Sequence, residues 1–180
     1  ILPFWMGRMV DVEQGGFYGQ IDGADRIIGG AGKGGILNAR ILWTFSAAYR
    51  VQPDSAYLHM AERAYGYALK YFFDEEMGGT YWLVNADGSP ADTKKQIYSQ
   101  AFFIYALTEY HMASGNEEAL AKAKELFHLI EQHSRDTQQG GYFEAYSRDW
   151  QLLDDLRLSE KDENEKKTMN THLHILEAYT

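Results

Sequence analysis

The sequence predicts an all-α fold built from helix pairs that repeat about every sixty residues. Three similar Gly-Gly-aromatic segments divide the chain, and their first glycines lie 63 and then 62 residues apart. Between these segments, apolar residues recur twice with helical spacing. Self-similarity at one period is typical of repeat architectures, in which a unit alone cannot bury its inner face. The segments are Gly15-Gly16-Phe17-Tyr18-Gly19, Gly78-Gly79-Thr80-Tyr81-Trp82 and Gly140-Gly141-Tyr142-Phe143-Glu144.

The first full repeat predicts helices over residues 36–51 and 55–73. In the first helix, Arg40 and Trp43 share a stripe that runs beside a second, apolar one. Pro53-Asp54-Ser55 is a start signal for the second helix, because Asp and Ser side chains cap the free N–H groups of a first turn. The Gly-Gly pairs predict backbone with positive φ, followed by a short strand or hairpin.

The second repeat predicts an inner helix and an outer helix. Residues 95–113 are apolar on nearly all sides, which is typical of a buried helix. Gly115-Asn116 marks its end, and residues 117–133 form a more polar, amphipathic pattern that suits an outer position.

A third inner helix is predicted to begin at Met169, after a polar, charged connection over residues 158–167. No Gly, Pro or closing basic turn follows Tyr179, so the usual stop signals are absent. Asn170 and His174 lie four residues apart, and a helix places their amide and imidazole on one face. We therefore expect the site to continue in sequence outside this chain.

Helix pairs in this order can curve into an α/α toroid or a solenoid. We expect residues 1–180 to form a single domain fragment of about three helix pairs, which is half of a six-pair toroid.

Composition narrows the possible functions. A net charge of −9 without a concentrated basic cluster disfavours a nucleic-acid partner. The absence of Cys removes disulfides and thiolate chemistry, and no apolar run is long enough for a membrane span. The chain begins at Ile1, so its natural start is expected to be missing or processed, and a cytoplasmic location is the expectation. The 26 aromatic rings favour packing between helices, with sugar stacking as the alternative.

With these residues in place, the chain resembles the cellobiose 2-epimerases, within the N-acylglucosamine 2-epimerase superfamily. The matching segments are spread over essentially the whole chain. They are Leu2-Pro3-Phe4-Trp5, Gly15-Gly16-Phe17-Tyr18-Gly19, Ala39-Arg40-Ile41-Leu42-Trp43, Pro90-Ala91-Asp92-Thr93, Glu144-Ala145, Lys167-Thr168-Met169-Asn170 and Ile175-Leu176-Glu177-Ala178-Tyr179-Thr180.

The resemblance implies the first half of an (α/α)6 barrel and an isomerase. Such enzymes invert C2 of the reducing-end sugar of β-1,4-linked disaccharides, such as cellobiose, through an enediolate and without a metal or other cofactor. It also implies that the acid and base histidines lie in the other half, so that the isolated fragment is inactive. Mannobiose 2-epimerases and N-acylglucosamine 2-epimerases fit nearly as well.

Arg40 is a candidate substrate contact, because abstraction of a proton beside a sugar aldehyde needs fixed donors where the enediolate gains charge. We expect its guanidinium to lie in a buried helix beside an anionic or hydroxyl partner, with a structural ion pair as the alternative. The resemblance adds Tyr98, Asn170 and His174 as substrate contacts. By themselves these three residue types more often serve as a core or cap tyrosine, a helix-end amide and an ordinary helix histidine.

A metal site at His172 and His174 is rejected, because residues two apart on a helix point in different directions. Each predicted inner helix has a tyrosine near its end. Aligning the helices on these late tyrosines predicts that Arg40, Ala101 and Asn170 lie at one level of the toroid, with Tyr98 one turn earlier. Two functions of other classes stay open, a glycoside hydrolase or lyase and a non-catalytic sugar-binding toroid, since fold alone does not select a function.

Overall fold

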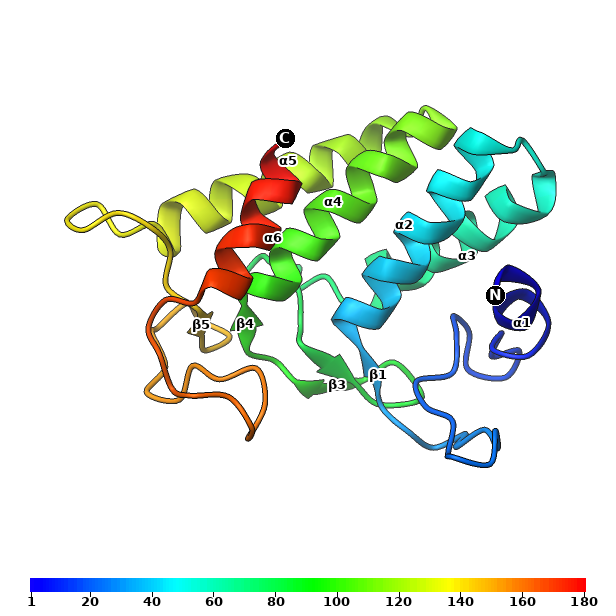
Figure 1. Ribbon diagram of the computed structural model, residues 1–180, viewed down its shortest axis with the longest axis horizontal. Helices are drawn as coiled ribbons and strands as arrows, with labels where there is room; N and C mark the ends of the chain where they lie inside the picture. The colour runs from blue at the N-terminus through cyan, green and yellow to red at the C-terminus, as the bar shows by residue number, and fades with distance from the viewer.

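Helices dominate the computed structural model, which describes residues 1–180 (Figure 1). The helices are α1 (Leu2–Gly7), α2 (Gly35–Val51), α3 (Ser55–Tyr71), α4 (Ile97–Ser114), α5 (Glu117–His133) and α6 (Met169–Tyr179). The strands are β1 (Lys33–Gly34), β2 (Leu83–Val84), β3 (Pro90–Asp92), β4 (Lys95–Gln96) and β5 (Ala145–Tyr146). No helix combines the length and the apolar character that a membrane crossing requires.

The helices form two layers. In Figure 1, α2, α4 and α6 lie side by side with α4 in the middle, and the short strands lie below their starting ends. Helix α3 packs against α2, and α5 packs against α4, so each inner helix is followed by its outer partner. The predicted order of inner helix, outer helix and Gly-Gly turn is confirmed.

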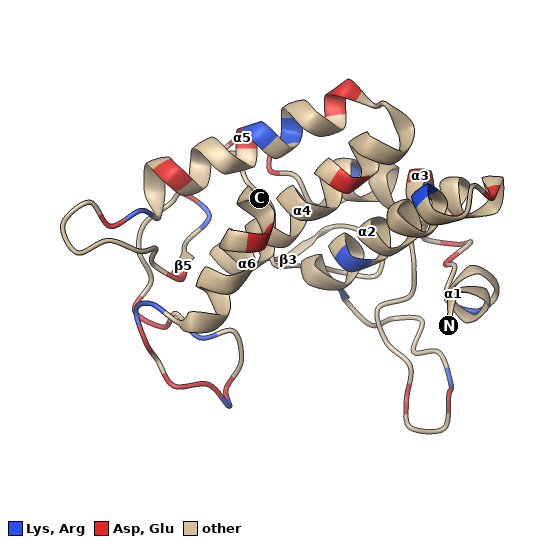
Figure 2. Cartoon of the chain, turned by 45° about the horizontal axis from the view of Figure 1, so that its top comes forward, with Lys and Arg blue, Asp and Glu red and all other residues tan.

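Burial follows the predicted patterns. In α4, 12 of the 18 residues are buried, as expected for a helix that is apolar all round. Helix α5 buries only one narrow stripe and exposes its charged side. The inner helices carry few charged positions, which Figure 2 shows as mainly tan ribbons. The buried stripe of α5 is Ala119, Ala123, Leu126 and Ile130.

Two helix ends differ from the prediction by two residues, because the neighbouring residues form β pairs instead. Helix α4 begins at Ile97 and not at position 95, since Lys95 and Gln96 form β4 and pair with β5 in antiparallel register. Helix α3 ends at Tyr71, because Phe73 already forms a bridge with Thr80.

The strands tie neighbouring repeats together just before each inner helix. Strands β1, β2 and β3 form one antiparallel sheet, with Lys33 opposite Val84, and β4 pairs with β5, with Lys95 opposite Tyr146. The backbone N–H of Gly35, the first residue of α2, donates to the carbonyl oxygen of Trp82 at 2.9 Å. The equivalent bond at α4 runs from Ile97 to Glu144, also at 2.9 Å. Each inner helix is therefore positioned by the segment that follows the next Gly-Gly turn.

All six glycines of the Gly-Gly pairs have positive φ, between 63° and 82°, as predicted. The short strands predicted after the pairs are present at the second and third turns as β2 and β5, and each turn itself closes a single β-bridge, such as Phe73 with Thr80. Gly79 also has no room for a side chain. A Cβ atom there would lie 2.8 Å from a ring carbon of Trp150 and 3.2 Å from the side-chain oxygen of Gln100.

Gly79→Ala should therefore destabilise the chain more than Gly115→Ala does. Both glycines have φ near 75°, so both substitutions carry the strain of a left-handed backbone, about 1–2 kcal/mol. Nothing lies within 4 Å of a Cβ at Gly115, whereas overlap at Gly79 should add about 1–3 kcal/mol. Urea unfolding of the two variants measures the difference, and equal losses would contradict the steric argument.

A lysine–aspartate pair, buried in the first two repeats and partly exposed in the third, links each Gly-Gly turn to the next inner helix. We call these the anchor pairs. In each, an Asp that lies four residues before the first glycine accepts from the Lys that directly precedes the N-cap of the next inner helix. The pairs are Lys33–Asp11 at 2.8 Å, Lys95–Asp74 at 2.8 Å and Lys167–Asp136 at 2.5 Å.

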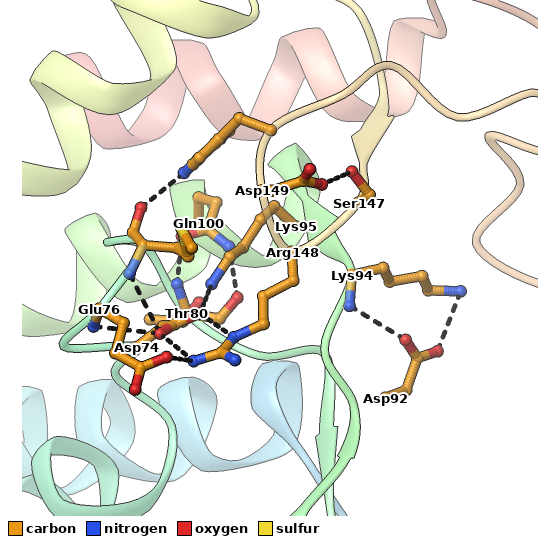
Figure 3. Close-up of polar contacts among 12 residues, drawn as sticks. Asp74, Glu76, Thr80, Asp92, Lys94, Lys95, Gln100, Ser147, Arg148 and Asp149 are labelled. Carbon is orange, nitrogen blue, oxygen red and sulfur yellow. Dashed lines mark hydrogen bonds and ion pairs between the residues drawn. The ribbon is translucent and has the colours of Figure 1, made fainter.

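The second anchor pair, Lys95–Asp74, carries the most contacts (Figure 3). Asp74 is fully buried and also accepts from Arg148 Nε at 2.8 Å and Arg148 Nη2 at 2.9 Å. Its other partners are backbone N–H groups of the Gly-Gly turn. The ammonium of Lys95 lies 4.8 Å from the ring centroid of Tyr81. At the third pair, hydrogen bonds from Lys167 and from the turn lower the pKa of Asp136 to about 2.

Candidate functional site

The anchor lysines define common levels on the three inner helices. Residues three, seven and ten positions after each lysine occupy equivalent places on α2, α4 and α6. We call these nine residues the inner stripe. They are Ile36, Tyr98 and Asn170 at the first level, Arg40, Phe102 and His174 at the second, and Trp43, Tyr105 and Glu177 at the third.

Phe102 joins the three helices at the second level. The Cζ atom of Arg40 lies 4.7 Å from the Phe102 ring centroid, a cation–π distance. On α6, the His174 ring centroid lies 4.5 Å from the same Phe102 ring. Tyr98 completes the group, with its ring 4.6 Å from His174 and nearly perpendicular to it at 81°. Three of the four predicted site residues therefore meet around one phenylalanine.

Asn170 lies on the same helix as His174 but faces a separate hollow. This hollow has a volume of about 210 Å³ and lies between the start of α6 and the charged connection that begins near Leu158. Asn170 is exposed, and it makes no ring or ion contact with the other three predicted residues. The structure thus places it beside the group around Phe102 and not within it.

Two expectations about Arg40 are wrong. Its side chain is exposed, and it makes no ion pair or hydrogen bond within the chain; its partner is the Phe102 ring. The reason is the orientation of α2, which buries Leu42 and Phe45 and leaves Arg40 on the open side. The predicted grouping of Arg40 with Ala101 and Asn170 is also wrong, because the residues of α4 and α6 at the level of Arg40 are Phe102 and His174.

Each of the four predicted residues has a polar group without a hydrogen-bond partner within the chain. Neither the Arg40 guanidinium, the Tyr98 hydroxyl, the Asn170 amide nor Nε2 of His174 takes part in a hydrogen bond. The other histidine of α6 contrasts with this. His172 Nδ1 lies 2.7 Å from the Thr168 carbonyl oxygen, and its Nε2 accepts from the Tyr142 N–H at 3.0 Å.

His172 is therefore a structural residue that holds the third Gly-Gly turn. Its two nitrogens face groups of the chain, while His174 faces the rings of α4, so the two histidines do not converge on one point. No group of three or more His, Asp or Glu side chains is placed to hold a metal ion.

The third level lies one turn further along the inner helices than this group. Trp43 and Tyr105 stack with centroids 5.3 Å apart and planes at 14°. Burial, and after it the charge of Glu177, raise the pKa of Tyr105. Glu177 Oε2 also lies 2.7 Å from Nδ1 of His174.

The position of His174 depends on how α6 begins. Lys167 holds this end through Asp136 and through the Gly140 carbonyl oxygen at 2.7 Å. The buried carboxylate of Glu144 accepts from the Thr168 N–H at 2.5 Å and from the Thr171 hydroxyl. A carboxylate at this place also offsets the positive end of the helix dipole.

Sequence reasoning missed Phe102, Glu177 and the anchor pairs. A signal for the anchors was present, because the pattern Asp-x-x-x-Gly-Gly occurs at 11–16, 74–79 and 136–141. Phe102 and Glu177 carried no comparable signal, since an aromatic residue and a glutamate are common anywhere on a helix.

Comparison with known proteins identifies the family of this chain. The N-acylglucosamine 2-epimerase (GlcNAc 2-epimerase) family matches residues 16–179. A cellobiose 2-epimerase from Bacteroides fragilis is 58% identical over 180 residues, which are 100% of this chain and 46% of that protein. The structure of a cellobiose 2-epimerase from Bacillus thermoamylovorans superimposes with a TM-score of 0.95 at 46% identity, over 99% of this chain and 46% of that one.

A second solved structure, the cellobiose 2-epimerase from Spirochaeta thermophila, gives a TM-score of 0.92 at 46% identity over 99% of this chain and 44% of that one. The chain thus spans less than half the length of these relatives, and the predicted half of an (α/α)6 barrel is confirmed. Matches of this extent, in sequence and in structure, mean that the chain belongs to the N-acylglucosamine 2-epimerase family.

Proposed function

We propose that this chain supplies the sugar-holding half of a 2-epimerase that acts on β-1,4-linked disaccharides such as cellobiose. One observation carries the proposal. Four polar groups without a hydrogen-bond partner lie on the first two levels of the inner stripe. They are the Arg40 guanidinium, the Tyr98 hydroxyl, the Asn170 amide and Nε2 of His174. Polar groups that the chain itself leaves unpaired are available for sugar hydroxyls. The identity to cellobiose 2-epimerases supports this substrate class.

The proposed reaction opens the sugar ring, removes the C2 proton and returns a proton to the opposite face. The intermediate enediolate carries negative charge on oxygen, and fixed N–H donors stabilise such charge. Arg40 has this role in the proposal, because its guanidinium keeps all its donors free while the Phe102 ring holds it. Tyr98, Asn170 and His174 orient the sugar.

The groups that move the proton belong, in this proposal, to the rest of a longer protein. The inner stripe contains a single histidine, His174, and epimerisation at C2 needs an acid and a base on opposite faces of the sugar. Hydrolysis of a glycosidic bond fits the stripe less well, since it needs two carboxylates and the stripe has only Glu177. Mannobiose and N-acylglucosamine stay alternative substrates, and a cytoplasmic location stays a prediction.

Cellobiose in D2O tests the proposal, with C2 deuteration followed by NMR. We expect the 180-residue chain to bind cellobiose weakly and to leave C2 unlabelled. The longer protein should introduce deuterium at C2 and form the mannose-containing epimer. Labelling by the chain alone would show that its own residues move the proton. Release of reducing sugar from a β-glucan by the longer protein would favour a hydrolase instead.

A further inference from the structure

His174 is held from two sides, and its two nitrogens have different surroundings. Its ring lies 4.6 Å from Tyr98 and 4.5 Å from Phe102, so both rings of α4 restrict its orientation. Nδ1 lies 2.7 Å from Oε2 of Glu177, three residues later on α6. Nε2 has no partner within the chain.

This contact determines which nitrogen carries the proton when the ring is neutral. A glutamate carboxylate only accepts hydrogen bonds, so Nδ1 must donate and must carry the hydrogen. The neutral ring then has its lone pair on Nε2. Without such a partner, a histidine in water prefers the other tautomer, with the hydrogen on Nε2.

Glu177 has no other side-chain hydrogen bond or ion pair in the structure. Its side chain makes no ion pair with Lys or Arg, and it is about half exposed, at 54%. On the inner stripe the only other charged residue is Arg40, which lies on the Phe102 ring. Glu177 is also the only carboxylate on α6.

We propose that Glu177 is a positioning residue that keeps His174 in the Nδ1–H tautomer, so that Nε2 accepts a hydrogen bond from a sugar hydroxyl. His174 is then an acceptor towards the sugar, whereas Arg40 is a donor. The identity of the ligand rests on the proposed function, but the tautomer does not.

Long-range ¹⁵N–¹H NMR of the imidazole rings measures the tautomer directly in this chain, at a pH at which His174 is neutral. His174→Gln identifies its signals among those of the six histidines. We expect Nδ1–H to dominate in the unmodified chain, and Glu177→Ala to lower the ratio of Nδ1–H to Nε2–H about three-fold or more. Glu177→Gln should keep most of this ratio, because its amide oxygen still accepts from Nδ1.

Glu125→Ala is the matched control. Glu125 forms a partly exposed pair with Lys122 three residues earlier on α5, at 2.8 Å, and its loss should leave the His174 signals unchanged. A dominant Nε2–H form in the unmodified chain, or an unchanged ratio in Glu177→Ala, would overturn the inference.

Addition of cellobiose separates this inference from the proposed function. Binding through Nε2 should shift its ¹⁵N resonance. If the tautomer ratios behave as expected but cellobiose moves no signal of the inner stripe, the positioning role of Glu177 is supported and the proposed substrate is wrong.

Discussion

Asp74→Asn should lower the free energy of unfolding by about 3–5 kcal/mol, because it leaves the buried charge of Lys95 without its counter-ion. Both side chains of this pair are 0% exposed, so water cannot replace the lost partner. The substitution also weakens two hydrogen bonds from Arg148, which join the turn at Asp74 to the segment after β5. Urea unfolding at neutral pH measures the loss.

The loss should shrink in acid. Burial by itself would raise the pKa of Asp74, but hydrogen bonds from Arg148 and Lys95 outweigh it and hold this pKa well below its usual range. A carboxyl with a depressed pKa contributes stability above its unfolded pKa of about 3.9, and this stability is lost as the pH falls towards the folded value. The unmodified chain should therefore approach the variant as the pH falls below about 4.

Asp155→Asn is the control for this prediction. Asp155 pairs with Arg157 at 2.8 Å, but its side chain is 60% exposed, and exposed pairs typically contribute only about 0–1 kcal/mol. Equal losses in the two variants would show that burial of the anchor pair does not matter.

Arg40→Ala should strongly lower the catalytic activity. In the longer protein that we propose, it should lower the rate of C2 exchange about 10²–10³-fold, as expected when one fixed donor to a developing oxyanion is lost. Arg40→Lys should recover only part of this rate, since an ammonium lacks the planar, forked donors of a guanidinium. The rate is measured by C2 deuteration of cellobiose in D2O.

Arg50→Ala controls for the loss of a positive charge on α2. Its guanidinium pairs with Glu109 of α4 at 2.7 Å and does not belong to the inner stripe, so exchange should continue at nearly the original rate. The thermal stability of the Arg40→Ala chain should change little, because the side chain is exposed. A large fall in stability would mean that Arg40 supports the fold and not the sugar.

The sequence by itself determined the all-α class, the repeat and the position of each long helix. These features depend on local chemistry, namely the apolar periodicity, the N-cap at Asp54 and the glycines with positive φ. It also indicated the family, through motifs spread along the chain. The family resemblance also indicated Arg40, Tyr98, Asn170 and His174 as candidate substrate contacts.

Only the tertiary structure decided how these candidates lie relative to one another. Alignment on the late tyrosines failed, because they lie at different distances from the anchor lysines: Tyr49 follows Lys33 by 16 residues, Tyr110 follows Lys95 by 15, and Tyr179 follows Lys167 by 12. The level of each inner helix is set by the anchor pairs, whose partners lie 21 to 31 residues apart in the chain. An ion pair requires that its two partners meet at one place, and no local sequence pattern expresses this requirement. It brings Arg40 and His174 into contact with the same Phe102 ring.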